Sequence, residues 1–544
     1  MDFQVLISGA GPVGLTLAMD LARRGIRVGV VEIRRRGELP NVKCNHVASR
    51  TMEAFRLLGV ADKVRSAGLP PDYPNDCVYR TTVTGDEITR IPIPSAAERR
   101  TAFDGPDTWW PTPEPAHRIN QIYLEPILFA QALAQPNITI LNETELVAVD
   151  QDEAGVRGIV RNMGNDNSTT LTAQILVGCD GSRSLVRNVI GAKLIGDAVV
   201  QRAQSTYIRA PKLLSLIPGR PGWMNLSLNP RRSGNTIAID GRETWLIHNY
   251  LYENELDFDA VDRDASIRAI LGVGPDFEYE VISKEDWIGR RLVADRFRDR
   301  RVFICGDSAH LWVPYAGYGM NAGIADAMNL SWQIAARLHG WGGAAILDAY
   351  MAERGPITEQ VSHFAMNHAF GAIRHRREVP AAVEAPGPLG QQAREEFGKA
   401  VYDLNVRQYC CGGLNFGYFY DRSPIIAYDG ESPPSYSIDA FTPSTVPGCR
   451  TPHFWLANGR SAYDAFGIGF TLLRFDSAID VAPLLEAASR RGMPLQLLDI
   501  RPCERLELFR ENLLLSRPDF HVAWRGNAMP DDAAGLVDII RGAA

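Results

Sequence analysis

The sequence lacks the features that mark membrane-spanning, secreted or nucleic-acid-binding proteins. Its 544 residues contain no apolar run of the roughly 18 residues that a membrane-spanning helix requires. The N-terminus has no basic region, and the apolar stretch from Phe3 is interrupted by Gly9, Gly11 and Pro12, so no signal peptide is expected. Acidic residues (64) outnumber basic ones (57), and the net charge is −7. Without a basic excess to replace counterions, a nucleic-acid partner is not expected.

Cysteine is sparse and unpatterned. The eight cysteines include no CxxC pair and no metal-like spacing, so neither dithiol chemistry nor a metal site is expected. Cys503, near the C-terminus, is expected to be a buried packing residue. Scattered cysteines in a chain of this length are typical of a reducing compartment, and we expect a cytoplasmic protein without a membrane partner.

Length and patterning predict an α/β protein of several domains. A chain of 544 residues, 45% of them hydrophobic, is too long to fold around a single hydrophobic core. Strand and helix patterns of a nucleotide-binding domain occupy about 1–75, 116–190 and 290–375. Short alternating runs in about 76–115 and 191–289 predict an interleaved antiparallel sheet. Residues 376–446 have weak periodicity and are expected to be an extended connector, and 447–544 repeat a strand and helix alternation.

A glycine-rich turn near the N-terminus gives the clearest functional signal. The apolar strand Phe3–Ser8 leads into Gly9-Ala10-Gly11-Pro12-Val13-Gly14, then a helix, then a second strand that ends at Glu32. In this order the first glycine permits the turn, the second lets backbone approach a pyrophosphate, and the third allows close helix packing. Glu32 is placed to bond a ribose hydroxyl, so the pattern predicts a dinucleotide such as FAD or NAD.

Two later segments point to FAD. Residues 179–187 (CDGSRSLVR), which include Asp180, resemble the DG motif of the class A flavoprotein monooxygenases, the single-component aromatic hydroxylases. Residues 306–310 (GDSAH), followed by Pro314 and 317–321 (GYGMN), resemble that family's GD segment. The resemblance implies FAD contacts from Gly306, Asp307, Gly319, Met320 and Asn321.

Further motifs extend the resemblance over nearly the whole chain. Arg50 begins a segment (RTME) similar to the family's helix near the flavin, and Gln121 matches a glutamine that reaches the ribityl chain. Residues 447–453 and 515–525 resemble the family's C-terminal domain. The resemblance implies a Rossmann-like FAD-binding domain of the p-hydroxybenzoate hydroxylase type, a substrate domain, and a thioredoxin-like domain over 447–544. A homodimer is also expected.

The resemblance implies aromatic hydroxylation with NAD(P)H and O2, through a flavin C4a-hydroperoxide. Because one dinucleotide fold is recognisable, NADPH or NADH is expected to bind transiently. A base that ionises a phenol speeds ring attack, yet the position that carries Asp or His in phenol-type relatives is Asn45, an amide. The adjacent His46 is a candidate relay or substrate ligand, and Pro314 is a further candidate at the reaction centre.

The wall of the substrate pocket is expected from the antiparallel region. Polar and aromatic candidates there and beside the flavin are Trp223, Trp245, His248, Tyr250, Trp287 and Tyr315. Ala316 replaces a glycine common in relatives, which implies a local difference in backbone. Because Asn45 stands where phenol-type relatives carry Asp or His, a simple phenol is less strongly indicated, and a larger polycyclic phenolic substrate is admitted as well. A Baeyer–Villiger or antibiotic-modifying oxygenase, and a flavin-binding homologue without turnover, remain alternatives.

Overall fold

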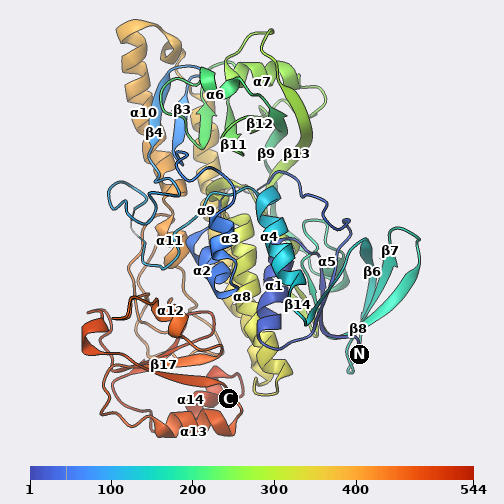
Figure 1. Ribbon diagram of the computed structural model, residues 1–544, viewed down its shortest axis with the longest axis vertical. Helices are drawn as coiled ribbons and strands as arrows, with labels where there is room; N and C mark the ends of the chain where they lie inside the picture. Colours follow the sequence, from blue (N-terminus) through green and yellow to red (C-terminus); the bar gives the residue numbers. More distant parts are fainter. Residues whose placement is uncertain (44–45, 109) are drawn as a thin grey trace.

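The computed structural model describes residues 1–43, 46–108 and 110–544. Within these residues the strands named below form three sheets, arranged one above another along the long axis of Figure 1. The lower sheet belongs to the C-terminal region, and the other two are built from interleaved segments of residues 1–312. This mixed arrangement confirms the α/β fold class.

The first sheet carries the glycine-rich turn. Its order is β14-β15-β8-β1-β2-β5, formed by Arg298–Asp299, Val302–Ile304, Ser168–Gly178, Phe3–Ser8, Val28–Val31 and Ile138–Leu141. β1 pairs in parallel with both β2 and β8, and its side chains are nearly all buried because helices and strands cover both faces. β6 (Thr144–Gln151) and β7 (Val156–Asn162) extend it as an antiparallel ribbon.

Helices cover this sheet and bring later motifs to its edge. α1 (Pro12–Arg23) follows β1 directly and packs beside the twenty-residue α8 (Gly319–Leu338), as Figure 1 shows. α4 (Gln121–Leu133) lies on the other side of α1. The remaining small helices here are α2 (Ser49–Leu57), α3 (Ala61–Arg65) and α5 (Leu185–Val189). Val13, in the first turn of α1, lies against Gly306 and Gly323, so the turn after β1 meets the loop after β15 and the first turns of α8.

The second sheet forms a broad wall above the first. Its order is β16-β13-β9-β12-β11-β10-β3-β4, formed by His310–Trp312, Glu280–Ala294, Leu194–Arg209, Thr244–Tyr250, Gly234–Ala238, Met224–Ser227, Cys77–Arg80 and Glu87–Ile91. Most neighbours are antiparallel, whereas β10 and β3 run in parallel. α6 (Leu213–Leu216) and α7 (Arg263–Leu271) accompany it. β16 begins at His310, the last residue of the GD segment. This segment therefore connects β15 of the first sheet to β16 of the second.

Two long helices occupy regions that the sequence pattern describes poorly. α9 (Ala349–Arg377) has 29 residues and contacts α8 and β13. α10 (Gly387–Tyr409) packs on β4 within the segment expected to be extended, so that expectation is corrected for its 23 residues. α11 (Gly412–Phe416) follows, and the rest of the segment to residue 446 contains no further helix or strand among the described residues.

The C-terminal sheet has the order β18-β17-β19-β20, formed by Leu495–Asp499, Phe470–Arg474, Leu513–Ser516 and Val522–Gly526. A parallel β-α-β unit with α13 (Ala482–Arg490) precedes an antiparallel hairpin and α14 (Ala533–Ile540), which is the thioredoxin-like arrangement. α12 (Ala462–Ala465) leads into it. Cys503 is exposed, contrary to expectation, because it lies in a short surface turn.

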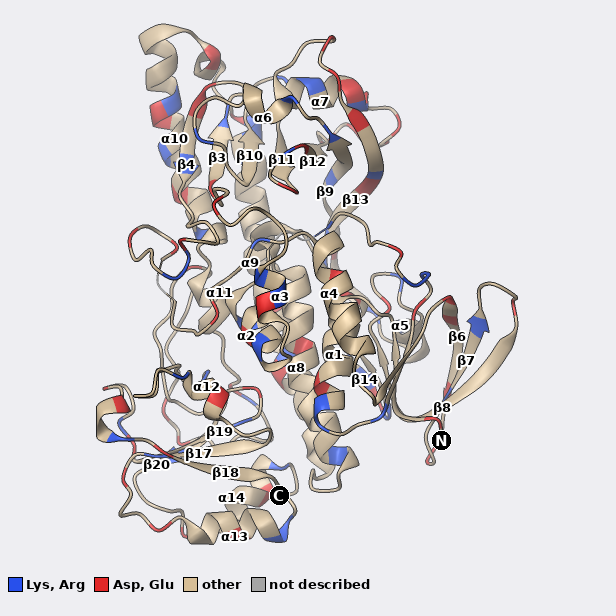
Figure 2. Cartoon of the chain, in the orientation of Figure 1, with Lys and Arg blue, Asp and Glu red and all other residues tan. Residues whose placement is uncertain are grey.

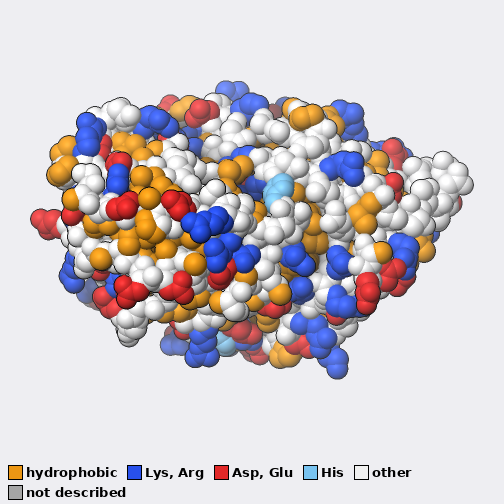
Figure 3. All heavy atoms as spheres, turned by 90° about the horizontal axis from the view of Figure 1, so that it is seen from below, with side chains coloured by type: hydrophobic (Ala, Val, Ile, Leu, Met, Phe, Trp, Pro, Cys, Tyr) orange, Lys and Arg blue, Asp and Glu red, His pale blue; other side chains and the backbone are white. Residues whose placement is uncertain are grey.

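The surface carries both signs of charge. Figure 2 shows acidic and basic residues interspersed over all three regions. The view from below shows the same mixture around a group of hydrophobic side chains (Figure 3). None of the helices formed by residues 1–43, 46–108 and 110–544 has the length and apolarity needed to cross a membrane.

Candidate active site

The three motif glycines differ in what surrounds them. A Cβ on Gly14 would lie 2.0 Å from the Gly9 carbonyl oxygen, so this close approach of α1 to the turn requires glycine. Gly9 has φ +104, a conformation that favours glycine. A Cβ on Gly11 would meet no protein atom within 4 Å, because Gly11 faces a large cavity. Two glycines therefore shape the turn, and the third leaves space for a ligand.

Glu32 lies directly beneath this turn. Its carboxylate accepts a hydrogen bond from the Ala10 N–H at 2.7 Å and pairs with Arg34 at 2.9 Å. Burial alone would raise the pKa of Glu32, but these hydrogen bonds outweigh burial and lower it. Arg34 also pairs with Glu125 at 2.8 Å, and Gln121 donates to the same carboxylate. The result is a polar wall that ends at the cavity.

Asp180 joins the two later motifs. Its carboxylate accepts hydrogen bonds from Ser184 Oγ (2.5 Å), the Val186 N–H (3.1 Å) and Ser308 Oγ (3.0 Å). The DG loop after β8 is thereby held against the GD loop after β15. Asp307, one residue before Ser308, faces the cavity, and burial raises the pKa of its carboxyl group.

The start of α8 closes the same side of the cavity. Gly319 and Met320 line it, and the N-terminal amides of a twenty-residue helix favour negative charge nearby. The Asn321 side chain accepts from the Ala48 N–H at 2.8 Å and donates to the Gly317 carbonyl at 2.7 Å. Ala316 has φ 60 and ψ 0, a left-handed conformation that is strained for alanine.

One cavity of about 1030 Å³ extends from the glycine turn to the second sheet. Its volume exceeds the upper end of the 300–1000 Å³ range, roughly, that single small-molecule sites occupy. Predicted cofactor residues that line it are Gly11, Pro12, Val13, Gln121, Asp307, Gly319 and Met320. Predicted catalytic and substrate residues that line it are His46, Trp223, His248, Tyr250, Trp287, Pro314 and Tyr315.

Gly9, Gly14, Glu32, Asp180, Gly306 and Asn321 lie behind this lining. These residues support the cavity wall through the hydrogen bonds and close backbone contacts described above. The Gly306 N–H also donates a hydrogen bond to Asp326 at 3.3 Å. The structure therefore brings the predicted motifs together around one cavity.

Aromatic and imidazole rings form the end of the cavity under the second sheet. Trp223 packs edge-to-face on Tyr409 with ring centroids 6.4 Å apart, and His248 packs on Trp287 at 5.8 Å. Burial lowers the pKa of His248 to about 4, so this imidazole is neutral near pH 7. The Tyr250 hydroxyl accepts a hydrogen bond from the Asn235 side chain at 2.8 Å. These rings provide a mostly apolar surface with few polar groups.

His46 lies between the flavin-motif loops and this aromatic end. It is buried, and a Cβ on Gly317 would approach its Cβ to 3.1 Å. Burial, and then the positive charges of Arg118 and Arg99, lower its pKa well below the usual value. The imidazole is therefore neutral at physiological pH and is a weak proton acceptor. Asn45, the alternative at this point, lies outside the described residues.

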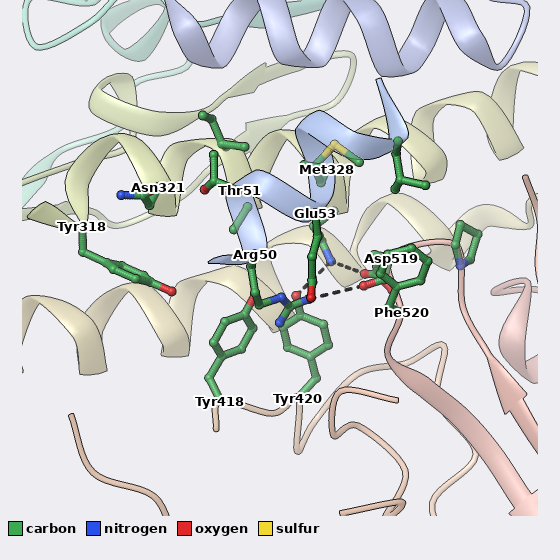
Figure 4. A pocket seen from close by; sticks show the side chains of 16 residues that line it. Arg50, Thr51, Glu53, Tyr318, Asn321, Met328, Tyr418, Tyr420, Asp519 and Phe520 are labelled. Atoms are coloured by element: carbon green, nitrogen blue, oxygen red, sulfur yellow. Dashed lines mark hydrogen bonds between the residues drawn. The ribbon is translucent and has the colours of Figure 1, made fainter. Parts of the chain in front are cut away.

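Arg50 does not line the large cavity, and its expected place near the flavin stays a prediction. Its guanidinium points toward the C-terminal domain, where it contacts His521 Nε2 at 3.2 Å and donates to the Asp519 carbonyl at 3.3 Å. It also lies over the Tyr418 ring at 4.7 Å. Arg50, Tyr418 and Asp519 line a separate cavity of about 40 Å³, drawn in Figure 4. The Arg50 side chain is long enough to extend from α2 to His521 and Asp519 of the C-terminal domain.

Trp245 also departs from expectation. It is fully buried and packs with Ile208, Ile247 and Ile270 on the opposite face of the second sheet. His248 lies three residues further along β12 and faces the cavity, as strand alternation requires of residues separated by an odd number. Trp245 is therefore a packing residue.

Sequence reasoning missed several lining residues. Val401, Asn405, Gln408 and Tyr409 come from α10, which was expected to be an extended connector. Arg118 and Arg376 also line the cavity. Neither arginine belongs to a motif with a recognisable spacing, so no local signal in the sequence identifies them.

A glycine turn, an acid beneath it and two aspartate loops around one cavity define a flavoprotein-type dinucleotide site. Comparison with known proteins agrees: the FAD binding domain family matches residues 2–365, and the aromatic-ring hydroxylase C-terminal family matches residues 444–543.

Individual relatives match over the full length. The aklavinone 12-hydroxylase RdmE of Streptomyces purpurascens is 32% identical, covering 99% of this chain and 98% of its own. The structure of RebC with reduced flavin has a TM-score of 0.90 and 32% identity, covering 100% of this chain and 99% of the other. An aklavinone-11 hydroxylase with FAD and aklavinone has a TM-score of 0.81 and 28% identity, covering 99% of each chain.

The chain belongs to the class A flavoprotein monooxygenases, the FAD-dependent aromatic-ring hydroxylases. It is an FAD-dependent aromatic monooxygenase that uses reduced nicotinamide and O2.

Proposed function

We propose that this enzyme hydroxylates a polycyclic phenolic compound at the aromatic end of the large cavity. The observation that carries the proposal is the continuity of one space of about 1030 Å³ from Gly11 to Trp223. A single ring would leave most of the aromatic end unfilled, and unfilled apolar space forfeits contact energy. Among related structures, RebC has been solved with bound 7-carboxy-K252c and an aklavinone-11 hydroxylase with aklavinone.

The residues fit FAD in the other half of the cavity. Gly11 offers a surface without a side chain, and the start of α1 offers amide groups to a pyrophosphate. Gln121 and Asp307 face this space and offer polar groups to the ribityl hydroxyls. Glu32, behind the lining and bonded to the Ala10 N–H, is the acid next to the position proposed for the ribose. FAD held by these residues would supply the hydride-accepting and O2-activating chemistry of the reaction.

The remaining cavity residues orient the substrate and exclude water. His248 and Trp287 form one aromatic wall, and Tyr250 and Tyr315 add hydroxyl groups to it. Neutral His46 serves as a hydrogen-bonding contact for the substrate, since its lowered pKa makes it a poor base. Pro314, which has no N–H, contributes only its carbonyl oxygen as an acceptor.

Two panels of compounds test this proposal. The purified flavin-loaded enzyme is mixed with NADH or NADPH and with either single-ring phenols or hydroxylated polycyclic arenes. We expect polycyclic compounds to accelerate nicotinamide oxidation and to be converted stoichiometrically into ring-hydroxylated products. Coupled turnover of single-ring phenols alone would contradict the proposal, and an ester product would identify Baeyer–Villiger chemistry instead.

The division of the chain is also proposed: FAD-binding segments of about 1–75, 116–190 and 290–375, and substrate segments of about 76–115 and 191–289. The sheet pairings support it, because β3, β4 and β9 to β13 share one sheet. The homodimer and the cytoplasmic location stay predictions. Light scattering of the purified protein tests the first of them.

A further inference from the structure

Arg118 places a buried positive charge on the cavity wall. The residue is 4% exposed, and the buried Nε of its guanidinium has no hydrogen-bond partner among the described residues. Two other cations on this wall pair with carboxylates: Arg34 with Glu32, and Lys43 with Glu285 at 2.7 Å. Arg376 donates instead to Tyr315 and Gln201, and Arg183 is exposed. Arg118 is the buried member of this set, and no carboxylate pairs with it among the described residues.

The surroundings hold the guanidinium in a fixed position. His117 and Val47 exchange backbone hydrogen bonds of 2.8 and 2.9 Å, which anchors the chain on which Arg118 lies. The guanidinium carbon lies 4.0 Å from the centroid of the Trp223 ring. A stacked guanidinium uses its flat face for the aromatic ring and leaves its N–H edge available to a second partner.

The neighbouring charges do not satisfy this group. Asp107, which lies near Arg118, is already paired with Arg99 at 2.8 Å, and both of these residues are buried. Burial lowers the pKa of the Arg118 guanidinium, yet arginine remains protonated near neutral pH because its usual pKa is so high. A buried charge without a partner is costly, and an anion entering the cavity would offset that cost.

We propose that Arg118, stacked on Trp223, binds an anionic oxygen group of the aromatic substrate, either a carboxylate or an ionised phenol. This inference rests on the proposed function, because the ligand is the substrate of that reaction. The guanidinium edge donates paired N–H groups to the anion, and the attached ring system extends along the aromatic wall. Arg118 is thus a specificity-determining residue that selects acidic substrates over neutral analogues.

Binding to the oxidised, flavin-loaded enzyme tests this inference without turnover. The probes are a hydroxynaphthoate, its methyl ester and the corresponding naphthol, and the readout is quenching of flavin fluorescence. Arg118→Gln is expected to weaken binding of the acid by about tenfold to hundredfold, the effect of losing a charged hydrogen bond, with little change for the ester. Arg118→Lys is expected to be intermediate, because it keeps the charge but loses the planar fork.

The naphthol distinguishes the two anions. If the anion is a phenolate, naphthol binding strengthens with rising pH in the wild type, and Arg118→Gln abolishes this dependence. If it is a carboxylate, only the acid responds. Arg490→Gln, on the exposed α13, is the matched control and leaves all three affinities unchanged.

Three results would overturn the inference: no binding of the acid to the wild type, equal losses for acid and ester without a pH-dependent naphthol affinity that Arg118→Gln removes, or unchanged binding of all probes in both Arg118 variants. A loss of acid selectivity in Arg376→Gln alone would assign the role to Arg376, which contacts Tyr315 and Gln201 on the same wall. The proposed polycyclic function fails separately, if polycyclic compounds bind but are never hydroxylated.

Discussion

Replacement of Arg517 tests how the thioredoxin-like domain is joined to the rest of the enzyme. Arg517 follows β19 and is fully buried. Its guanidinium bonds both carboxylate oxygens of Glu353 on α9, at 2.5 and 2.8 Å, and those of Asp519 at 3.1 and 2.7 Å. Arg517→Met removes the cation and leaves two buried carboxylates without it.

The expected loss of stability is large. Removing one partner of a buried ion pair costs about 3–5 kcal/mol, because the remaining charge is stranded. The control Arg490→Met removes an exposed pair with Glu486 on α13 and should cost no more than about 0.5 kcal/mol. Neutralising a stranded acid in the double variant Arg517→Met/Glu353→Gln should restore part of the loss.

Thermal unfolding is followed by tryptophan fluorescence and, separately, by release of flavin. We expect Arg517→Met to unfold several degrees below both the wild type and Arg490→Met. If Arg517→Met and Arg490→Met unfold at the same temperature, or if the double variant is additive, the ion-pair network does not join the two parts as described.

Three further predictions concern the cofactor site, the pH response and the substrate wall. Gly11→Ala should fold with unchanged apo-protein stability and lose FAD affinity, whereas Gly14→Ala should also lose about 1–3 kcal/mol of stability through overpacking; flavin content and apo-protein melting temperature separate the two. Burial lowers the pKa of His368 from 6.5 to about 4, so the unfolded chain binds a proton first and stability falls as pH falls through this window, by up to about 3 kcal/mol. His368→Gln should flatten the dependence of melting temperature on pH between about 6.5 and 4, and an unchanged slope would show that His368 is not its source. Trp245→Phe should lower the melting temperature without changing KM, and Trp287→Phe should change KM or the coupling of NAD(P)H to product; the reverse pattern would show that their placements are exchanged.

Local patterns in the sequence predict the cofactor half of the site well. The turn from β1 to α1 is specified by neighbouring residues: an apolar strand, glycines at three positions and a helix whose first residue is proline. Asp180 and Asp307 are far apart in sequence, but each follows a buried strand of the same sheet, so their meeting at its edge follows from parallel topology.

The substrate half depends on contacts that no local pattern contains. α9 buries residues on several sides, including the charged Glu353 and Arg354, and therefore lacks a single apolar stripe. α10 reaches the cavity only because it packs on β4. Arg118 acquires its position from Trp223, which is more than a hundred residues away in sequence. Tertiary packing, rather than residue type, determines these placements.

Incorporation of isotopically labelled O2 is the most direct test of whether the enzyme hydroxylates a polycyclic phenol. The flavin-loaded enzyme, NAD(P)H and a polycyclic phenol react under labelled O2, and the product is analysed by mass spectrometry. The account predicts one labelled oxygen atom as a new ring hydroxyl, with the other atom released as water and one nicotinamide oxidised per product. Flavin reduction without labelled product for any aromatic compound would contradict it.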